Sequence, residues 1–293
     1  MGGGAAVGMT PGVALRLGRV SNLPTVWSNV LAALALAGAP LYQASTLALL
    51  VAMSLFYVGG MYLNDAFDAP RDARERAERP IPMGQVSRGT VFAVGFGGLA
   101  LGVGILAAIG MEAPESAAAG LALAAAIVVY DVWHKDNPIS PVLMGLNRLL
   151  VYVAAAVVAV GAVSTQVVGA GALLLCYVIG LTYAAKQEHL ARIDGLWPLA
   201  FLVAPFVVAA AYLPSAPAAA GLVALAFVAW TVRAVGFLVR PAPQVGRAVV
   251  SLIAGISLFD ATVLAILGDL AAAALAVAAF GLTLVLQRYV PGT

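Results

Sequence analysis

Charged residues and cysteine are both scarce in this sequence of 293 residues. Only 10% of the residues are Asp, Glu, Lys or Arg, whereas a water-soluble domain carries roughly 25%. Hydrophobic residues make up 63%, and the mean hydropathy is +1.02, so a water-soluble fold is excluded. The single cysteine, Cys176, excludes an intramolecular disulfide, and the formal net charge of +2 gives no reason to expect a nucleic-acid partner.

Period-two alternation of apolar and polar residues, which a lipid-exposed barrel of strands requires, is also missing. The sequence instead contains ten Ala/Leu/Val-rich runs, close to the roughly 20 residues that a helix needs to cross a bilayer. We therefore predict an all-α polytopic membrane protein of about nine or ten transmembrane helices. We expect one domain, residues 1–293, with a flexible tail at residues 1–15. The runs are 20–39, 44–63, 88–110, 116–132, 141–161, 166–185, 197–213, 217–239, 248–267 and 270–288.

The basic residues predict the orientation. If ten runs cross the membrane, the joints alternate between its two sides, and all 15 Lys and Arg residues fall at one side. The opposite joints carry only the acidic residues Glu112, Glu115 and Asp269. We therefore expect the basic side and both termini to be cytoplasmic, in a cytoplasmic membrane of bacterial or archaeal type.

The sharpest local signal is residues 62–87, YLNDAFDAPRDARERAERPIPMGQVS. Asn64, Asp68 and Asp72 stand four residues apart, so a helix continuing from the second run would place them on one face. Such oxygen ligands suit a hard cation such as Mg²⁺, which borrows its other ligands from phosphate. The alternative is an ordinary charged loop, in which the aspartates pair with the arginines of the same segment, Arg71, Arg74, Arg76 and Arg79.

The same segment closely resembles the first aspartate-rich signature of the UbiA-type intramembrane prenyltransferases. The matching pattern is Asn64-Asp65-x-x-Asp68-x-x-x-Asp72, then Arg79-Pro80-x-Pro82-x-Gly84-x-x-Ser87. Two further segments support the resemblance: Arg19-x-x-Asn22-Leu23-Pro24 before the first run, and Tyr130, Lys135 and Pro138-x-Ser140-Pro141 after the fourth. Together these motifs cover about the first half of the chain, in the family's order and on the family's side of the membrane.

The resemblance implies a helical barrel around a lipid-accessible cavity, in which a prenyl chain passes from its diphosphate to a small, often aromatic, acceptor. It also implies Mg²⁺ as cofactor, with Asn64, Asp68 and Asp72 as ligands, and catalytic roles for Asp68, Asp72 and Lys135. The substrate-binding residues that it implies are Arg19, Asn22, Asp65, Arg71, Arg79, Tyr130, Lys186 and Glu188. The expected partners are a prenyl diphosphate, a small aromatic or lipid acceptor and membrane lipid.

The stretch after the sixth run departs from the family's pattern. Members usually carry a second aspartate-rich motif there, with two acidic residues four apart before a Gly-Ile-x-Thr-Leu-Pro-like turn. Here Gly195-Leu196-x-Pro198 is similar to the turn, but the paired aspartates are missing. Glu188 is the best remaining acid. It either supports a metal ion or pairs with Arg192 one helical turn later.

Two functions follow from this pattern. The intact first motif favours a Mg²⁺-dependent prenyltransferase, whereas the missing second motif favours a catalytically weakened relative that binds or moves a prenylated lipid or pigment precursor. A conventional ion-coupled transporter ranks third. Asp260 lies inside the ninth run, where an ionisable residue is costly. We expect it either to be functional, or to be protonated or hydrogen-bonded to a neighbouring helix through Ser257 or Thr262.

Overall fold

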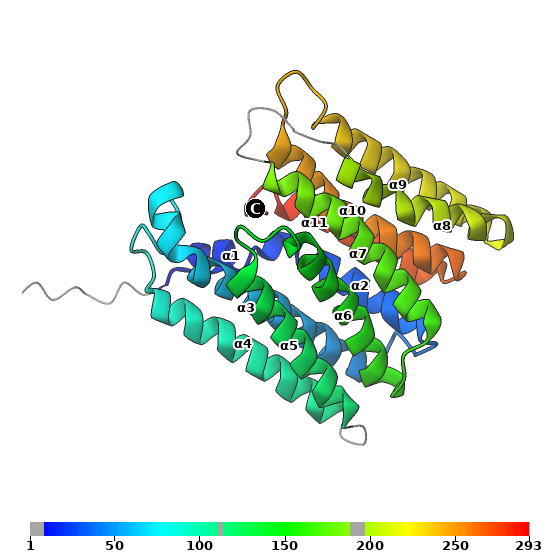
Figure 1. Cartoon of the computed structure of the whole chain (residues 1–293). Helices are drawn as coiled ribbons and strands as arrows, with labels where there is room; N and C mark the ends of the chain where they lie inside the picture. The colour runs from blue at the N-terminus through cyan, green and yellow to red at the C-terminus, as the bar shows by residue number, and fades with distance from the viewer. Residues whose placement is uncertain (1–8, 111–113, 188–196, 293) are drawn as a thin grey trace, which may run out of the picture.

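The computed structural model describes residues 9–110, 114–187 and 197–292 (Figure 1). Within these ranges the chain is helical and forms no strand, which confirms the predicted all-α class. The α-helices are α1 (Pro11–Leu17), α2 (Pro24–Leu36), α3 (Ala44–Glu75), α4 (Arg88–Ile109), α5 (Glu115–Trp133), α6 (Ser140–Val160), α7 (Thr165–Lys186), α8 (Ala204–Tyr212), α9 (Ala218–Gly236), α10 (Val245–Ile266) and α11 (Leu270–Leu286). Three short 3₁₀-helices are η1 (Val20–Asn22), η2 (Trp197–Val203) and η3 (Leu213–Ser215).

Eight helical segments of the described chain are long and apolar enough to cross a bilayer. They are α3, α4, α5, α6, α7, the segment from η2 to η3, α9 and α10. The apolar segments Val20–Leu36 and Leu270–Leu286 are shorter. These ten segments coincide with the ten predicted runs, so the prediction of a polytopic helical protein is confirmed.

The helices close a ring. In order around it, α2, α3, α5, α6, α7, α10 and α11 each contact the next, and α11 returns to α2. The first and last parts of the chain are therefore neighbours in space, as the blue and red ribbons of Figure 1 show. Because α2 also contacts α6 and α10, the ring is filled at the level of α2.

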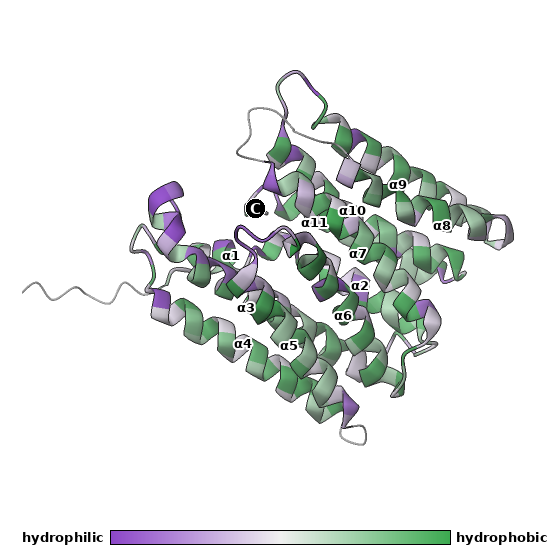
Figure 2. Ribbon diagram, viewed as in Figure 1, coloured by the Kyte–Doolittle hydropathy of each residue, from purple (hydrophilic) through white to green (hydrophobic). Residues whose placement is uncertain are grey.

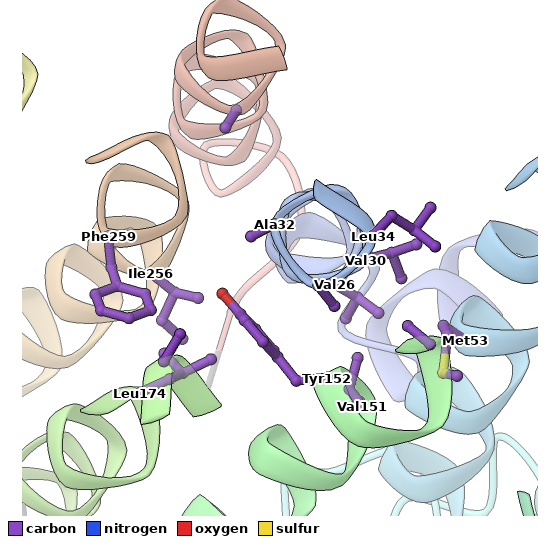
Figure 3. Close-up of a cluster of buried hydrophobic side chains, with 14 of the residues drawn as sticks. Val26, Val30, Ala32, Leu34, Met53, Val151, Tyr152, Leu174, Ile256 and Phe259 are labelled. Carbon is purple, nitrogen blue, oxygen red and sulfur yellow. The ribbon is translucent and has the colours of Figure 1, made fainter. Parts of the chain in front are cut away.

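Helix α2 supplies the centre of the core. Figure 3 shows Val26 and Val30 of α2 beside Tyr152 of α6, with Ile256 and Phe259 of α10 on the other side of that ring. All five side chains are almost completely buried. Apolar packing of this kind fixes the relative positions of the helices that surround the cavity described below.

Glycines bring α3 and α4 close together. A Cβ atom at Gly59 would lie 2.8 Å from the carbonyl oxygen of Gly95, and one at Gly95 would lie 2.7 Å from the Leu63 side chain. Small residues at such crossings let helix backbones approach within a membrane. This contact fixes α3, the helix that carries the predicted metal ligands.

Asp260 is a fully buried carboxyl group of α10. Its Oδ2 atom lies 2.5 Å from Ser28 Oγ and accepts a hydrogen bond from Asn29 Nδ2 at 2.7 Å. Its Oδ1 atom accepts one from the Tyr152 hydroxyl. Asp260 therefore joins α10 to both α2 and α6, as buried polar groups in a membrane protein must find partners within the protein.

The partners that we predicted for Asp260 are wrong, although the prediction of a bond to a neighbouring helix is confirmed. Thr262 donates to the Leu258 carbonyl of its own helix at 2.8 Å. Ser257 contacts Ser28 at 3.1 Å instead of Asp260. The true partners lie on helices far away in the sequence, which helical spacing does not reveal.

Hydrophilic residues gather at the end of the bundle where α3 ends and α4 begins (Figure 2).

The prediction of a flexible tail at residues 1–15 is wrong for residues 11–15, which belong to α1. Pro11 begins that helix and Thr10 caps it, because Thr10 Oγ1 accepts from the Val13 amide. Val13 and Leu17 are buried in a small cluster beside α3 and α4, so this short helix is held by packing.

Candidate active site

A cavity of about 660 Å³ opens at the hydrophilic end of the bundle. Its walls come from α3, the joint between α5 and α6, the first turns of α6, the last turns of α7 and the start of α10. Of the predicted site residues that the structure describes, all except Asp65 line this cavity. The lining residues are Arg19, Asn22, Asn64, Asp68, Arg71, Asp72, Arg79, Tyr130, Lys135 and Lys186. Glu188 lies outside the described residues.

The predicted acidic row is carried by one unbroken helix. Asn64, Asp68 and Asp72 lie on successive turns of α3, face the cavity and are each no more than 6% exposed. Pro70 lies inside this helix and removes the amide that would bond the Ala66 carbonyl. The side chain of Arg88, at the start of α4, donates to that carbonyl at 2.7 Å, so the acceptor that Pro70 leaves is satisfied.

Basic side chains face every carboxylate of this row. Lys135 lies 2.9 Å from Asp68, and His134 lies 3.5 Å from the same oxygen. Arg79 lies 3.3 Å from Asp72 and 2.8 Å from Asp65. The carboxylates share one face of a helix that runs to Glu75, so the alternative of a charged loop is wrong for this part of the segment. Its pairing is found for Asp65 and Asp72, which contact Arg79, whereas Asp68 pairs with Lys135 and His134 from outside the segment.

Asp65 lies behind the cavity wall and connects two of its cations. Its Oδ1 atom contacts both Arg19, at 3.0 Å, and Arg79, at 2.8 Å. The side chain is 9% exposed and does not line the cavity, unlike the other predicted substrate-binding residues that the structure describes. This geometry makes Asp65 a positioning residue for the two guanidinium groups.

Arg19 has a backbone conformation that non-glycine residues rarely adopt, with φ at 41° and ψ at 45°. The bend directs its side chain toward α3, where Nη2 contacts Asn64 Oδ1 at 3.3 Å as well as Asp65. Burial would lower the pKa of the Arg19 guanidinium, but the nearby Asp65 carboxylate raises it above its usual value. Arg19 therefore keeps its positive charge at the cavity.

Asn22, which we predicted to bind substrate, forms hydrogen bonds with the last residues of the described chain through both the nitrogen and the oxygen of its side-chain amide. Its Nδ2 atom donates to the Gly292 carbonyl at 2.8 Å, and its Oδ1 atom accepts from Gln287 at 2.9 Å. Gly292 also lines the cavity. In this structure Asn22 therefore holds the chain end beside the cavity mouth.

The remaining predicted residues lie around the rim. Tyr130 stacks on His134, with ring centroids 4.9 Å apart. Lys186, from the last turn of α7, donates to the Asn137 carbonyl at 2.6 Å and so reaches the joint between α5 and α6. Arg71 contacts Glu75 at 2.8 Å and Asp136 at 3.0 Å in a more exposed position.

Several polar residues around the site were not among our predictions, Asp131 and Arg148 among them. Asp131, on α5, accepts from Asn64 Nδ2 at 3.2 Å, while its own Oδ2 atom is buried without a partner in the described part of the chain. Arg148 lies two turns inside α6 and lines the inner cavity. The sequence signal for Arg148 was available, because an arginine inside an apolar run is by default a functional candidate.

The ligand atoms offered by Asn64, Asp68 and Asp72 are of the kind that binds Mg²⁺. Carboxylate and amide oxygens are the hard ligands that this ion prefers, and a diphosphate could complete its coordination. Within the described residues, no group of three His, Cys, Asp or Glu side chains is placed to hold a metal ion. The row offers two carboxylates and the Asn64 amide oxygen, so any ion held there would depend strongly on ligands from phosphate.

The cavity is strongly asymmetric in charge. The carboxylates that line it within the described residues all come from α3 or the joint after α5: Asp68, Asp72, Glu75 and Asp136. The described wall formed by α7 and α10 carries Lys186 and otherwise mainly apolar side chains, among them Val178, Leu181, Val249, Ile253 and Ile256. The mouth therefore suits a charged group and the inner wall an apolar chain.

Fold and cavity together define a class of molecule: a polytopic helical membrane protein with an acid-and-base site at one end of the bundle. No family model matches the chain. Over 95 residues it is 38% identical to the digeranylgeranylglyceryl phosphate synthase of Methanopyrus kandleri. That match covers 32% of this chain and 35% of the relative, so it spans about a third of that protein's length.

Two solved structures share the fold over most of their length. One, from work on digeranylgeranylglyceryl phosphate synthase in membranes, has a TM-score of 0.56 at 18% identity and covers 87% of this chain and 98% of the other. The second, the apo structure of a UbiA homologue from Aeropyrum pernix K1, has a TM-score of 0.51 at 17% identity, with 92% and 98% covered. These likenesses show that the chain has the fold of solved UbiA-type structures, in agreement with the resemblance, and its long apolar helices support an integral membrane protein.

Proposed function

We propose that this chain transfers an isoprenyl group from a prenyl diphosphate to a small, aromatic acceptor within the membrane, with Mg²⁺ as cofactor. The observation that carries the proposal is the row of Asn64, Asp68 and Asp72, which shares one cavity mouth with Lys135 and Arg79. The relatives named above support it. A prenyl diphosphate matches the charged mouth and the apolar inner wall of the cavity, because its head is highly charged and its tail is apolar.

Each part of the chain has a task in this reaction. Lys135, Arg79 and Arg19 bind phosphate oxygens and stabilise the charge that develops on the departing diphosphate. Asp65 and Asp131 hold Arg79 and Asn64 in position. When bound by Asn64, Asp68 and Asp72, Mg²⁺ would neutralise part of the diphosphate charge.

The cavity also holds the prenyl chain of the diphosphate. The apolar side chains of α7 and α10 take the prenyl tail and keep water from the allylic carbon. The bond between that carbon and the diphosphate oxygen breaks, and pyrophosphate leaves. The acceptor's nucleophilic carbon or oxygen forms the new bond and loses its proton, which leaves with the pyrophosphate. Positioning two substrates in one membrane cavity lowers the entropic cost of this step.

A second candidate function is a weakened relative that binds or moves a prenylated lipid or pigment precursor. The observation that favours it is the opposite wall, where the described residues provide no carboxylate. Purified protein given Mg²⁺, labelled C5 to C20 prenyl diphosphates and a panel of aromatic acceptors distinguishes the two. Release of pyrophosphate coupled to a prenylated product supports the transferase. Saturable binding of the diphosphate with no product supports the binding protein.

A further inference from the structure

Three arginines converge on one aromatic ring at the joint between α9 and α10, residues 237–244. The guanidinium carbons of Arg233, Arg240 and Arg247 lie 5.1, 4.8 and 5.6 Å from the ring centroid of Phe237. The first belongs to the last turn of α9, the second to the joint and the third to the first turn of α10. We call these three residues the arginine cluster. The fold gathers them, because they come from three successive segments of the chain.

The ring that carries the arginine cluster is fixed by packing. Phe237 is only 7% exposed and belongs to a buried apolar group with Ala184 of α7 and Val249 of α10. The Gln244 amide donates to the Phe237 carbonyl at 2.9 Å, which closes the joint into a loop. The side-chain oxygen of Gln244 accepts from Arg247 at 2.9 Å. The buried ring and the closed loop therefore determine where the guanidinium groups lie.

The positive charge of the arginine cluster is not balanced by the part of the chain that the structure describes. All three side chains are exposed, and none of them contacts a described carboxylate. The Phe237 ring attracts each cation but carries no net charge, so the mutual repulsion of the cations remains. An anion placed among them would be attracted by all three. Guanidinium groups also match the oxygens of a phosphate in a paired arrangement.

The surroundings of the arginine cluster favour a lipid as the source of this anion. Helices α9 and α10 are both long enough to cross a bilayer, so the joint between them lies at the membrane surface (Figure 1). Trp230, whose ring lies 4.8 Å from the Arg233 guanidinium carbon, is the kind of residue that occupies this boundary. Beside the cluster in the sequence, Val232 is 66% and Val239 is 59% exposed. A molecule with a phosphate and an acyl chain uses both the cations and these apolar side chains, whereas free phosphate uses the cations alone.

We propose that the arginine cluster binds the phosphate of an anionic membrane phospholipid. The site is separate from the cavity, because none of the three arginines lines it. It lies behind the cavity wall, since Phe237 packs in one buried group with Val249, which does line the cavity. The bound headgroup therefore stabilises the wall that α7 and α10 form. The inference goes beyond the proposed prenyl transfer and does not depend on it.

The test measures the lipid preference of the full chain in detergent. Phosphatidylglycerol and phosphatidylcholine with the same acyl chains are added in equal amounts, and native mass spectrometry of the folded protein gives the ratio of the two bound lipids. Wild type should retain phosphatidylglycerol at least about tenfold over phosphatidylcholine, because each arginine near an anionic headgroup contributes roughly fivefold. The variant with all three cluster arginines changed to glutamine should bring the ratio close to one. Phe237→Leu keeps the three charges but removes the ring, and should lower the ratio about two- to fivefold.

A matched control loses the same number of charges elsewhere. Arg16, Arg74 and Arg288 are exposed, do not line the cavity and belong to the side of the membrane that we predict for all the basic residues. The variant with these three changed to glutamine should keep the wild-type preference. Equal losses in the control and in the cluster variant would overturn the proposal, because the preference would then come from overall surface charge. A wild-type ratio near one would overturn it as well.

Two further measurements complete the test. Inorganic phosphate or pyrophosphate, added at the same concentration as the lipid, should leave the bound phosphatidylglycerol in place. Its displacement by either would overturn the lipid assignment and identify a site for a free phosphate. Phosphatidylglycerol should also raise the melting temperature of wild type and of the matched control, but not that of the cluster variant. An equal rise in all three proteins would contradict the stabilisation of the cavity wall through this site.

Discussion

Replacing Asp260 with alanine should destabilise the fold rather than remove a catalytic group. The carboxyl joins three helices, since it contacts Ser28 and Asn29 of α2 and Tyr152 of α6 from its place on α10. Alanine leaves the Asn29 amide and the Tyr152 hydroxyl as buried donors without an acceptor. Ser28 loses less, because the Thr25 carbonyl lies 3.1 Å from its hydroxyl.

The size of the destabilisation follows from the two hydrogen-bond donors that lose their acceptor, the Asn29 amide and the Tyr152 hydroxyl. Each buried unsatisfied donor costs about 1–3 kcal/mol in proteins, while hydrogen bonds measured within membranes average nearer 0.6 kcal/mol. Two such donors, and the weakened balance of the charge on Arg148, which Asn29 connects to Asp260 through hydrogen bonds, give about 2–4 kcal/mol for Asp260→Ala. Asp260→Asn should lose less, because an amide still offers Tyr152 an acceptor oxygen.

Thermal unfolding in nanodiscs provides the measurement. The matched control is Asp269→Ala, which removes a carboxylate that caps the start of α11 by accepting from the Ala272 amide at 2.9 Å. Loss of such a cap costs about 1 kcal/mol. We expect the melting temperature to fall in the order wild type, Asp269→Ala, Asp260→Ala. An Asp260→Ala protein as stable as the Asp269→Ala control, but with impaired ligand binding, would refute the structural role.

Three further predictions concern the site and its orientation. Asp131→Leu removes the acceptor that holds the Asn64 amide, so Mg²⁺-dependent affinity for a prenyl diphosphate analogue should fall about ten- to a hundredfold by calorimetry; an unchanged Kd would contradict that positioning role. Lys186→Ala should weaken the same affinity through lost charge. Glu188→Gln should weaken it about ten- to a hundredfold if that acid supports the metal. Equal affinities in wild type, Lys186→Ala and Glu188→Gln would show that neither residue belongs to the site. A reporter fused after Arg79 or Arg240 should read cytoplasmic and one inserted at Ala216 external, because the basic residues mark the cytoplasmic side; an external reading at Arg79 would reverse the orientation.

The helical plan could be predicted because it depends on local composition. Each apolar run is long enough to hold its own backbone hydrogen bonds, so length and hydropathy define the spans without knowledge of their neighbours. The row on α3 was likewise readable, since a four-residue spacing places side chains on one face of any helix. The Thr10-Pro11 pair also carried a helix-start signal, which the expectation of a flexible tail overlooked.

Contacts between distant parts of the chain could not be predicted. Asn29 and Arg148 are 119 positions apart, and Asn22 and Gly292 are 270 apart, yet each pair forms a hydrogen bond. No local pattern encodes such a pair, because it depends on how whole helices pack. The role of Asp65 shows the same limit: spacing placed it beside the row, but only the packed structure turns it away from the cavity toward Arg19 and Arg79.

The most direct test of the proposed site is the binding of a non-hydrolysable prenyl diphosphate analogue to wild type and to Asp68→Ala. Asp68 faces the cavity and its carboxylate contacts Lys135 at 2.9 Å, so the change removes a ligand oxygen with little loss of packing. We predict saturable binding by wild type with Mg²⁺, and its loss both in chelator and in Asp68→Ala, at an unchanged melting temperature. Equal affinity in all three conditions would contradict a magnesium-dependent diphosphate site on α3.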